Sequence, residues 1–263
     1  MTAKEKQTPL PGTRPQGVPD ESEAAAWVRD MFTRIAPRYD LLNHLLSFSL
    51  DHVWRRRTAG AFLHILRRPQ ARILDLCCGT GDLAFALDRR RASAKGEGQA
   101  AGAQIFGTDF VEPMLIRARR KAHRGHRAVV FAAADALHLP FTDATFDLVT
   151  AAFGFRNLAN YQGGLREFAR VLKQGGEVGI LEFAEPSAGF LSGLFRFYFR
   201  NLLPRIGAAI SGSGKAYAYL PESVSKFPSP PNLSALLEGT GFCNVRFTSW
   251  NFGSVVLHSA KRV

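Results

Sequence analysis

The segment Arg72-Ile73-Leu74-Asp75-Leu76-Cys77-Cys78-Gly79-Thr80-Gly81-Asp82 sets the architecture of this chain, because an apolar strand there turns directly into a helix. Glycine in such a turn adopts positive φ and lets the backbone approach a ligand beside the free N–H groups of the helix start. A dinucleotide-binding turn needs a third glycine three residues later, and that residue is Ala84. Asp82 also places an anion where a pyrophosphate would bind. The turn therefore predicts a ligand without a phosphate.

Strands and helices alternate on both sides of this turn. We expect strands at 72–76, 104–108, 128–132, 146–152 and 177–183, with helices at 83–91, 112–122 and 164–172 between them. A helix at 233–238 and two strands at 245–250 and 255–260 complete the chain. Alternation of this kind predicts an α/β fold, a doubly wound and mostly parallel seven-stranded sheet. The short link between the last two strands predicts an antiparallel pair at the C-terminal edge.

The N-terminal region predicts a tail and then helices. Residues 1–20 are polar and proline-rich, without the apolar stretch of a signal peptide, so we expect a disordered tail. Asp20 and Glu23 have capping-box spacing before a helix that ends near Ala36, ahead of Pro37. Helices at 41–46 and 53–66 follow. We expect one domain over 21–263, in which 21–70 form a helical cap over a sheet edge.

Acidic residues stand at the ends of three predicted strands. Asp75 lies in the first strand, Asp109 closes the second, and Asp135-Ala136 follows the third. A carboxylate in the position of Asp109 can accept hydrogen bonds from both hydroxyls of a ribose. A lone acid at a strand end is often a helix cap. Three such acids at one edge indicate a ligand site instead.

The turn resembles the nucleotide-binding loop of class I methyltransferases, in which D/E-x-x-x-G-x-G follows the first strand. The resemblance implies S-adenosylmethionine, which has no phosphate and carries an ammonium and a sulfonium. Carboxylates at Asp75 and Asp82 fit those two positive charges. The resemblance also implies cofactor contacts at Gly79, Thr80 and Gly81, beside Asp75.

Further motifs are similar to those of the menaquinone/ubiquinone biosynthesis C-methyltransferases. They extend from about residue 31 to residue 261, at 31–40 (MFTRIAPRYD), 74–84, 107–110, 153–157 (FGFRN), 181–183, 203–207 (LPRIG), 217–223 (YAYLPES) and 241–242. The resemblance implies cofactor contacts at Thr80, Asp109, Asp135 and Ala136. The family's serine before the FGxRN motif is Ala152 here, which removes a hydroxyl but leaves a backbone contact.

The chemistry of a sulfonium methyl group restricts the acceptor. This methyl is an electrophile, so an electron-poor quinone ring cannot attack it, whereas the reduced hydroquinol can, as a phenolate. The enzyme must exclude water, align the reacting atoms and help to remove a phenolic proton. We therefore expect a prenylated demethylquinol as substrate. The Cys77-Cys78 pair resembles the menaquinone-side members and favours demethylmenaquinol; a benzoquinol of the ubiquinone pathway is the alternative.

Arg156 and Asn157 follow the fourth strand, at the edge where such folds bind ligands. Arg156 is expected to stabilise the phenolate or to lower the pKa of a water that Asn157 holds. The alternative is that both side chains only tie down their loop. Asp51 is the third catalytic candidate, and His52 and Tyr217 are weaker ones.

Composition places limits on partners and ligands. Hydrophobic residues make up 46% of the chain and charged residues 21%, the usual mix of a soluble globular protein. Lys and Arg number 34 against 22 Asp and Glu, and this net charge of +12 favours anionic partners. The three cysteines, two of them adjacent, make neither a disulfide framework nor a metal motif. We therefore expect no metal and a cytoplasmic location.

An insertion at 187–231 is too long for an ordinary connection, and we expect it to lie over the substrate site. Its stretch 190–210 is apolar and interrupted by three arginines and Pro204, which disfavours a membrane span. The pattern is typical of a membrane-surface helix, and equally of a helix on the substrate pocket or a homodimer contact. With the net charge, it favours an anionic membrane surface as partner, at the inner face of the cell membrane.

Two rival functions are less consistent with the sequence. A nucleic-acid methyltransferase that flips a base carries an acidic-Pro-Pro-aromatic turn after the fourth strand, and residues 154–157 (GFRN) lack it. The basic runs at 55–57, 67–68 and 89–91 lack the interleaved aromatics of a stacking platform, so no nucleic acid is expected. A non-catalytic binding protein would not need Arg156 and Asn157.

Overall fold

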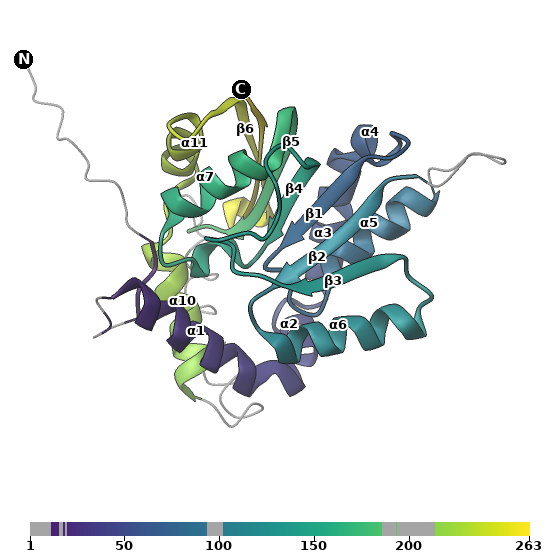
Figure 1. Cartoon of the computed structure of the whole chain (residues 1–263). Helices are drawn as coiled ribbons and strands as arrows, with labels where there is room; N and C mark the ends of the chain where they lie inside the picture. The colour runs from purple at the N-terminus through teal and green to yellow at the C-terminus, as the bar shows by residue number, and fades with distance from the viewer. Residues whose placement is uncertain (1–11, 16–17, 19, 94–101, 186–192, 194–213) are drawn as a thin grey trace, which may run out of the picture.

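Seven strands form one sheet in the order β3-β2-β1-β4-β5-β7-β6 in the computed structural model, which describes residues 12–15, 18, 20–93, 102–185, 193 and 214–263 (Figure 1). The strands are β1 (Arg72–Leu76), β2 (Gln104–Asp109), β3 (Val129–Ala133), β4 (Phe146–Ala152), β5 (Leu172–Phe183), β6 (Phe242–Trp250) and β7 (Val255–Arg262). β7 runs antiparallel to both of its neighbours, and the other paired strands are parallel. The predicted doubly wound sheet and its antiparallel C-terminal pair are confirmed.

Helices cover both faces of the sheet, because neighbouring strand residues point to opposite sides. Ile73 of β1 packs with one set of helices and Leu74 with the other. The first face carries α3 (Leu50–Ala61), α4 (Leu63–Leu66), α5 (Asp82–Ser93) and α6 (Glu112–Arg124). The second face carries α7 (Tyr161–Val171) and α11 (Pro230–Glu238). Two apolar cores result, one on each face.

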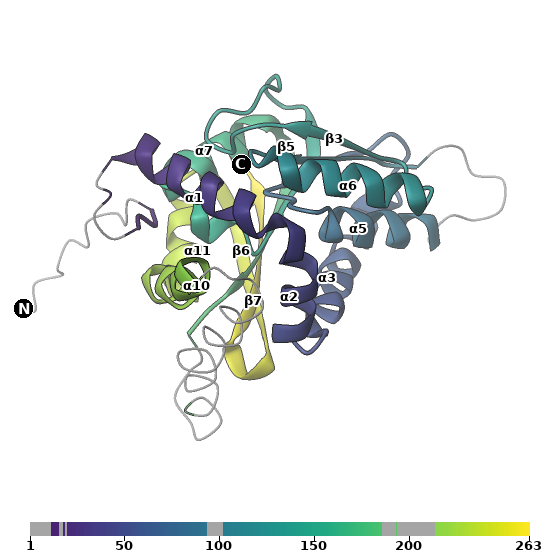
Figure 2. The same ribbon diagram turned by 90° about the horizontal axis from the view of Figure 1, so that it is seen from below.

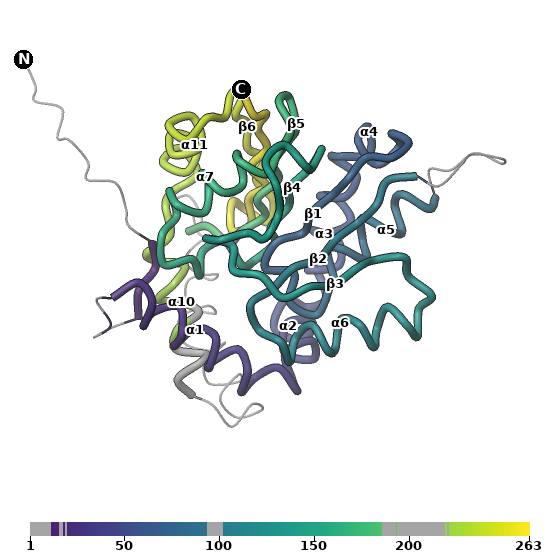
Figure 3. Tube along the Cα trace, in the orientation of Figure 1, coloured from purple at the N-terminus to yellow at the C-terminus, as the bar shows by residue number. Residues whose placement is uncertain are grey.

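A third layer closes the carboxyl ends of the parallel strands. It consists of α1 (Glu21–Ile35), the 3-10 turn η1 (Ala36–Arg38), α2 (Tyr39–Leu46) and α10 (Gly214–Lys226). The Asp20 side chain caps α1 by accepting from the backbone N–H groups of Ser22 and Glu23. Val28 on α1 packs with Tyr219 and other residues of α10, so segments far apart in sequence lie side by side (Figure 3).

The structure refines two sequence-based expectations. Of the segment 21–70 expected as a cap, only α1 to α2 belong to this layer, because Trp54, Phe62 and Ile65 from α3 and the residues after it belong to the core of the sheet. The helix expected at 53–66 is broken at Phe62, which leaves the helical conformation. Apart from residue 193, the stretch 190–210 lies outside the described residues, as does most of the expected tail. Among the described residues, no helix is both long and apolar enough to cross a membrane.

Candidate cofactor and substrate site

A pocket of about 740 Å³, counted with its open mouth, lies where the carboxyl ends of β1, β2 and β4 meet the cap. Ala25, Phe32 and Tyr39 of the cap line one side. The strand ends and loops line the rest with Leu76, Cys77, Gly79, Thr108, Asp109, Phe110, Val111, Met114, Ala134, Asp135, Ala136, Leu137, Phe153, Gly154, Asn157, Leu158 and Ala159. A largely apolar pocket with a few polar side chains is typical of a small-molecule site.

The turn after β1 at residues 77–82, which we call the glycine turn, is held against β2 by Asp109. The Asp109 carboxylate accepts from the backbone N–H of Gly79 at 2.8 Å and from that of Val111 at 2.9 Å. Gly79 has φ +55°, which glycine adopts without strain. Burial raises the pKa of Asp109 to about 6. A carboxylate has about four acceptor positions, so these backbone donors leave Asp109 able to accept from a ligand in the pocket as well.

Two glycines permit close packing around the pocket. A Cβ on Gly81 would lie 2.9 Å from the rings of Phe85 and Phe131. A Cβ on Gly154 would lie 2.4 Å from the Cβ of Cys77, because the loops after β1 and β4 touch there. Any larger residue at these two positions would push the pocket wall apart.

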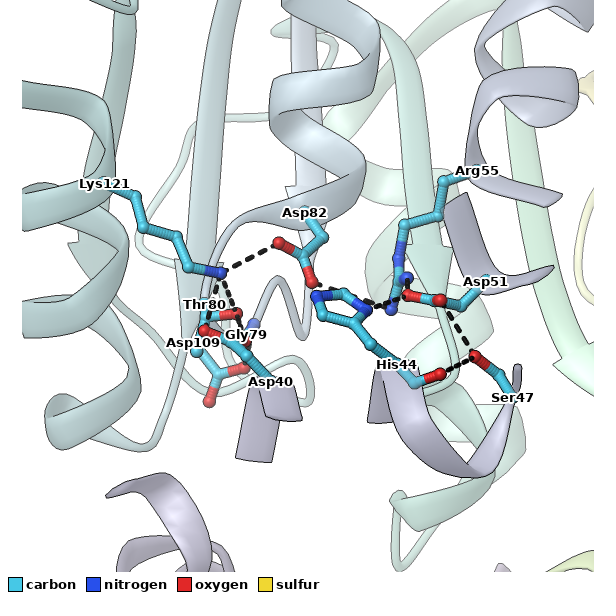
Figure 4. A network of polar contacts seen from close by, with 10 residues as sticks. All are labelled: Asp40, His44, Ser47, Asp51, Arg55, Gly79, Thr80, Asp82, Asp109 and Lys121. Carbon is cyan, nitrogen blue, oxygen red and sulfur yellow. Dashed lines mark hydrogen bonds and ion pairs between the residues drawn. The ribbon is translucent and has the colours of Figure 1, made fainter. Parts of the chain in front are cut away.

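A polar network ties the cap to the glycine turn (Figure 4). The Lys121 Nζ lies 2.8 Å from Asp40 Oδ2 and 2.9 Å from Asp82 Oδ1, and donates to Thr80 Oγ1 at 2.9 Å. Thr80 in turn donates to Asp40 at 2.5 Å. Burial alone would raise the pKa of Asp82, but Arg55 and Lys121 outweigh it and lower this pKa. The negative charge of Asp82, expected to face a cationic cofactor, is therefore balanced within the protein.

Asp51 lies at the other end of the same network. It is buried, pairs with Arg55, and accepts from Ser47 Oγ at 2.9 Å, with His44 Nδ1 also 2.9 Å away. Burial opposes the charge of Asp51, yet Arg55 and Ser47 lower its pKa. The exposed ring of His52 stacks on His44. Asp51 does not line the pocket, so in this arrangement it fixes α3 and the chain before it.

Arg156 and Asn157 differ in what they face. The buried Arg156 guanidinium donates to Glu182 Oε2 at 2.9 Å and to the carbonyl of Phe153, and Nε lies 3.4 Å from Ser223 Oγ. Glu182 also accepts from the Arg156 backbone N–H at 3.0 Å. Asn157 lines the pocket, and its Oδ1 is buried with no hydrogen-bond partner among the described residues. A ligand donor in the pocket would satisfy that oxygen.

The predicted cofactor residues fall into two groups. Gly79, Asp109, Asp135 and Ala136 line the pocket. The others stand behind its wall: Asp75, Thr80, Gly81 and Ala152.

Asp75 is the most deeply placed of that second group. Its Oδ1 accepts from Thr150 at 2.8 Å, and burial raises its pKa to about 7. Sequence reasoning assigned no role to Lys121 or Glu182. Glu182 could have been noticed as an acid near the end of an apolar strand, whereas Lys121 sits in a basic helix with no distinguishing signal.

The fold and the pocket define the class of protein. A solved S-adenosylmethionine-dependent methyltransferase from Thermotoga maritima matches 89% of this chain and 99% of its own, with a TM-score of 0.58 at 17% identity. Another from Aquifex aeolicus matches 78% of this chain and 89% of its own, with a TM-score of 0.54 at 19% identity. The fold is that of the class I methyltransferases.

The particular family follows from the sequence. The chain belongs to the ubiE/COQ5 methyltransferase family, whose model matches residues 19–262. The demethylmenaquinone methyltransferase of Thermus thermophilus is 48% identical over 88% of this chain and 100% of its own length. The enzyme of that name from Deinococcus radiodurans is 46% identical (90% and 92%). A ubiquinone/menaquinone biosynthesis C-methyltransferase of Geobacter sulfurreducens is 38% identical (92% and 90%). The chain is an S-adenosylmethionine-dependent methyltransferase.

Proposed function

We propose that this chain transfers a methyl group from S-adenosylmethionine to a ring carbon of a prenylated demethylquinol, namely demethylmenaquinol. The observation that carries the proposal is the apolar pocket at the strand ends, whose polar side chains include Asp109, Asp135 and the unsatisfied Asn157. The names of the relatives from Thermus and Deinococcus support demethylmenaquinol as the acceptor.

The residues around the pocket fit the cofactor. Asp109 lines the pocket as an acceptor for the ribose hydroxyls, and Asp135 with Ala136 follows β3 for the adenine. Gly79 leaves room for the amino-acid part, since the nearest atom to a Cβ there would be 3.8 Å away. S-adenosylmethionine supplies the electrophilic methyl group when bound. Asp75, Thr80, Gly81 and Ala152 act by shaping the wall.

The remaining lining suits an aromatic ring. Tyr39, Phe110, Phe153 and Leu158 exclude water from the reacting atoms and hold a ring in place. Asn157 Oδ1 accepts a hydrogen bond from a phenolic hydroxyl of the quinol and fixes the orientation of that ring.

Three side chains behind the pocket act on its shape or charge. Arg156, held by Glu182, positions the neighbouring Asn157, and we propose that its positive charge favours a phenolate in the pocket. Asp51 holds α3 and, through Arg55, the start of α5. No metal is required for this chemistry.

A lipid-soluble substrate also bears on where the protein works. The prenyl chain of a demethylquinol resides in a bilayer, and the net charge of +12 favours an anionic leaflet. We therefore propose a peripheral contact with the membrane, at its cytoplasmic face.

Product mass spectrometry tests the substrate directly. The chain is incubated with S-adenosylmethionine and, separately, a demethylmenaquinol, a demethylated benzoquinol of the ubiquinone type, and the oxidised demethylmenaquinone. We expect a methylated naphthoquinol and no product from the oxidised ring, because only the reduced ring is nucleophilic. Faster methylation of the benzoquinol would move the assignment to the ubiquinone pathway. Methylation of the quinone under strictly oxidising conditions would contradict the proposed chemistry.

A further inference from the structure

Four apolar side chains form an exposed ridge where α2 meets α3. Leu41 is 60% exposed, Leu45 49%, Phe48 75% and Leu50 38%. We call these four residues the apolar ridge. The two helices lie side by side on the outside of the molecule (Figure 2). A contiguous group of large apolar side chains on a surface marks a contact with a partner or a membrane.

The ridge is not a poorly packed part of the core. Leu42, on the inner side of α2, is fully buried against α1 and α10, so the helix already has its packing face. Leu41 and Leu45 are one turn apart and lie on the flank of the helix beside Leu42, roughly 60–100° around the axis, where they are exposed. Phe48 and Ser49 follow with φ of 51° and 59°, a left-handed conformation that side chains adopt only at a cost. The turn holds Phe48 at the surface in this unfavourable conformation.

The exposed charged side chains near the ridge in the sequence are basic. The two acids of this part of the chain are already paired, Asp40 with Lys121 and Asp51 with Arg55. The basic side chains nearby in sequence are exposed, at Arg34, Arg38, His52 and Arg56. An apolar surface with a basic surround is complementary to the headgroup region of an anionic bilayer.

The position of the ridge close to the pocket also favours a contact with the membrane. Tyr39, the first residue of α2, lines the pocket, and the ridge begins two residues later. In the proposed function this pocket, which opens to solvent, holds both the cofactor and the quinol ring. A long prenyl chain therefore extends out of the pocket. The prenyl chain can then lie against the apolar side chains of the nearby ridge.

We propose that the apolar ridge inserts into an anionic bilayer and sets the pocket mouth at the membrane surface, where a prenylated quinol enters from the lipid. This inference rests on the proposed function, since it takes the substrate to be membrane-borne. The ridge inserts only side chains and one helix face, and the polar network of Figure 4 keeps it attached to the cofactor turn.

The test compares two variants of the full chain. Leu45→Asp with Phe48→Asp removes the apolar contact, and aspartate tolerates the left-handed conformation at position 48 better than phenylalanine. Phe247→Asp is the control, because Phe247 is 45% exposed on β6, the edge strand at the far side of the sheet. Binding is measured by sedimentation with vesicles of mixed phosphatidylglycerol and phosphatidylcholine. Methyl transfer is measured with a vesicle-embedded long-chain demethylmenaquinol and with a detergent-dispersed short-chain one.

We expect the double variant to bind vesicles at least about tenfold more weakly than the unsubstituted chain, since one inserted Leu or Phe accounts for about that factor. Its turnover should fall on the embedded quinol and stay unchanged on the dispersed one, while Phe247→Asp matches the unsubstituted chain on both. Equal vesicle binding by all three proteins would overturn the inference. The inference would also be overturned if the unsubstituted chain were a dimer, and the double variant were a monomer that bound vesicles as well as the unsubstituted chain. The ridge would then contact a second copy of the chain. Failure of the unsubstituted chain on both quinols would instead count against the proposed function.

Discussion

The buried ion pair between Arg156 and Glu182 gives the most demanding prediction. Glu182→Gln keeps the shape of the side chain and an acceptor for the Arg156 backbone N–H, but removes the negative charge. The two side chains are only 7% and 2% exposed, so water cannot compensate the guanidinium. Breaking a buried pair by removing one partner costs about 3–5 kcal/mol. For a domain of this size, that corresponds to a fall of roughly 6–20 °C in Tm.

The measurement is thermal unfolding followed by circular dichroism, with a double-mutant cycle. Arg156→Met in the Glu182→Gln background removes the uncompensated charge, so the double variant should be less destabilised than the sum of the two single variants, by about 0.5–3 kcal/mol. Glu222→Gln is the control. Its pair with Lys226 is 2.6 Å long but partly exposed, so its loss should cost less than about 1 kcal/mol.

Glu182→Gln should also slow methyl transfer. The pair holds the loop that presents Asn157, and a small misplacement of a group that orients the substrate can cost about a hundredfold in rate. We expect kcat to fall more than the affinity for S-adenosylmethionine. A Glu182→Gln protein with the Tm of the Glu222→Gln control, or strictly additive effects in the cycle, would refute the reasoning.

Three further predictions follow from burial and close packing. The pKa of Asp109 is raised to about 6, so affinity for S-adenosylmethionine should fall below pH 6, by up to about tenfold per pH unit, and Asp109→Asn should abolish that dependence in calorimetric titrations. Gly154→Ala should destabilise by about 1–3 kcal/mol in urea unfolding, because its Cβ would meet Cys77, whereas Gly60→Ala, with open space in α3, should stabilise by about 0.5–1 kcal/mol. Burial raises the pKa of Asp75 to about 7, so the folded chain holds a proton that the unfolded chain loses near pH 4, and stability falls as pH rises between these values. The free energy of unfolding of Asp75→Asn should therefore rise relative to that of the unsubstituted chain over this pH range, by up to about 4 kcal/mol at pH 8. A difference that does not change with pH would show that Asp75 titrates normally.

The strands and the binding edge were predictable from local patterns. The alternation of apolar strands with helices predicted β1, β2 and β4, and the carboxyl ends of parallel strands meet at one edge, which brought Asp109, Asp135 and Asn157 to the pocket. These residues could be identified because their position depends on strand order alone. The antiparallel final pair followed from the short link at residues 251–253.

The partners of charged side chains could not be predicted in the same way. The sequence gives Asp82 a place at a helix start, but its contact with Lys121 depends on how α6 packs beside α5. Likewise, Arg156 follows a strand as a catalytic residue would, yet its guanidinium lies against Glu182, 26 residues away in the chain. Such pairs are set by tertiary packing. Local pattern therefore located the site and its ligand class but not the network behind its wall.

We propose that this pocket brings a sulfonium methyl group to a quinol ring carbon. Transfer of a carbon-13 methyl group from labelled S-adenosylmethionine to a demethylmenaquinol under reducing conditions, with the product analysed by NMR, tests this directly. We expect the label as a methyl group on the ring carbon, and we expect Asn157→Leu, folded by circular dichroism, to lose most of this product. Label on a phenolic oxygen, or full product from Asn157→Leu, would contradict it.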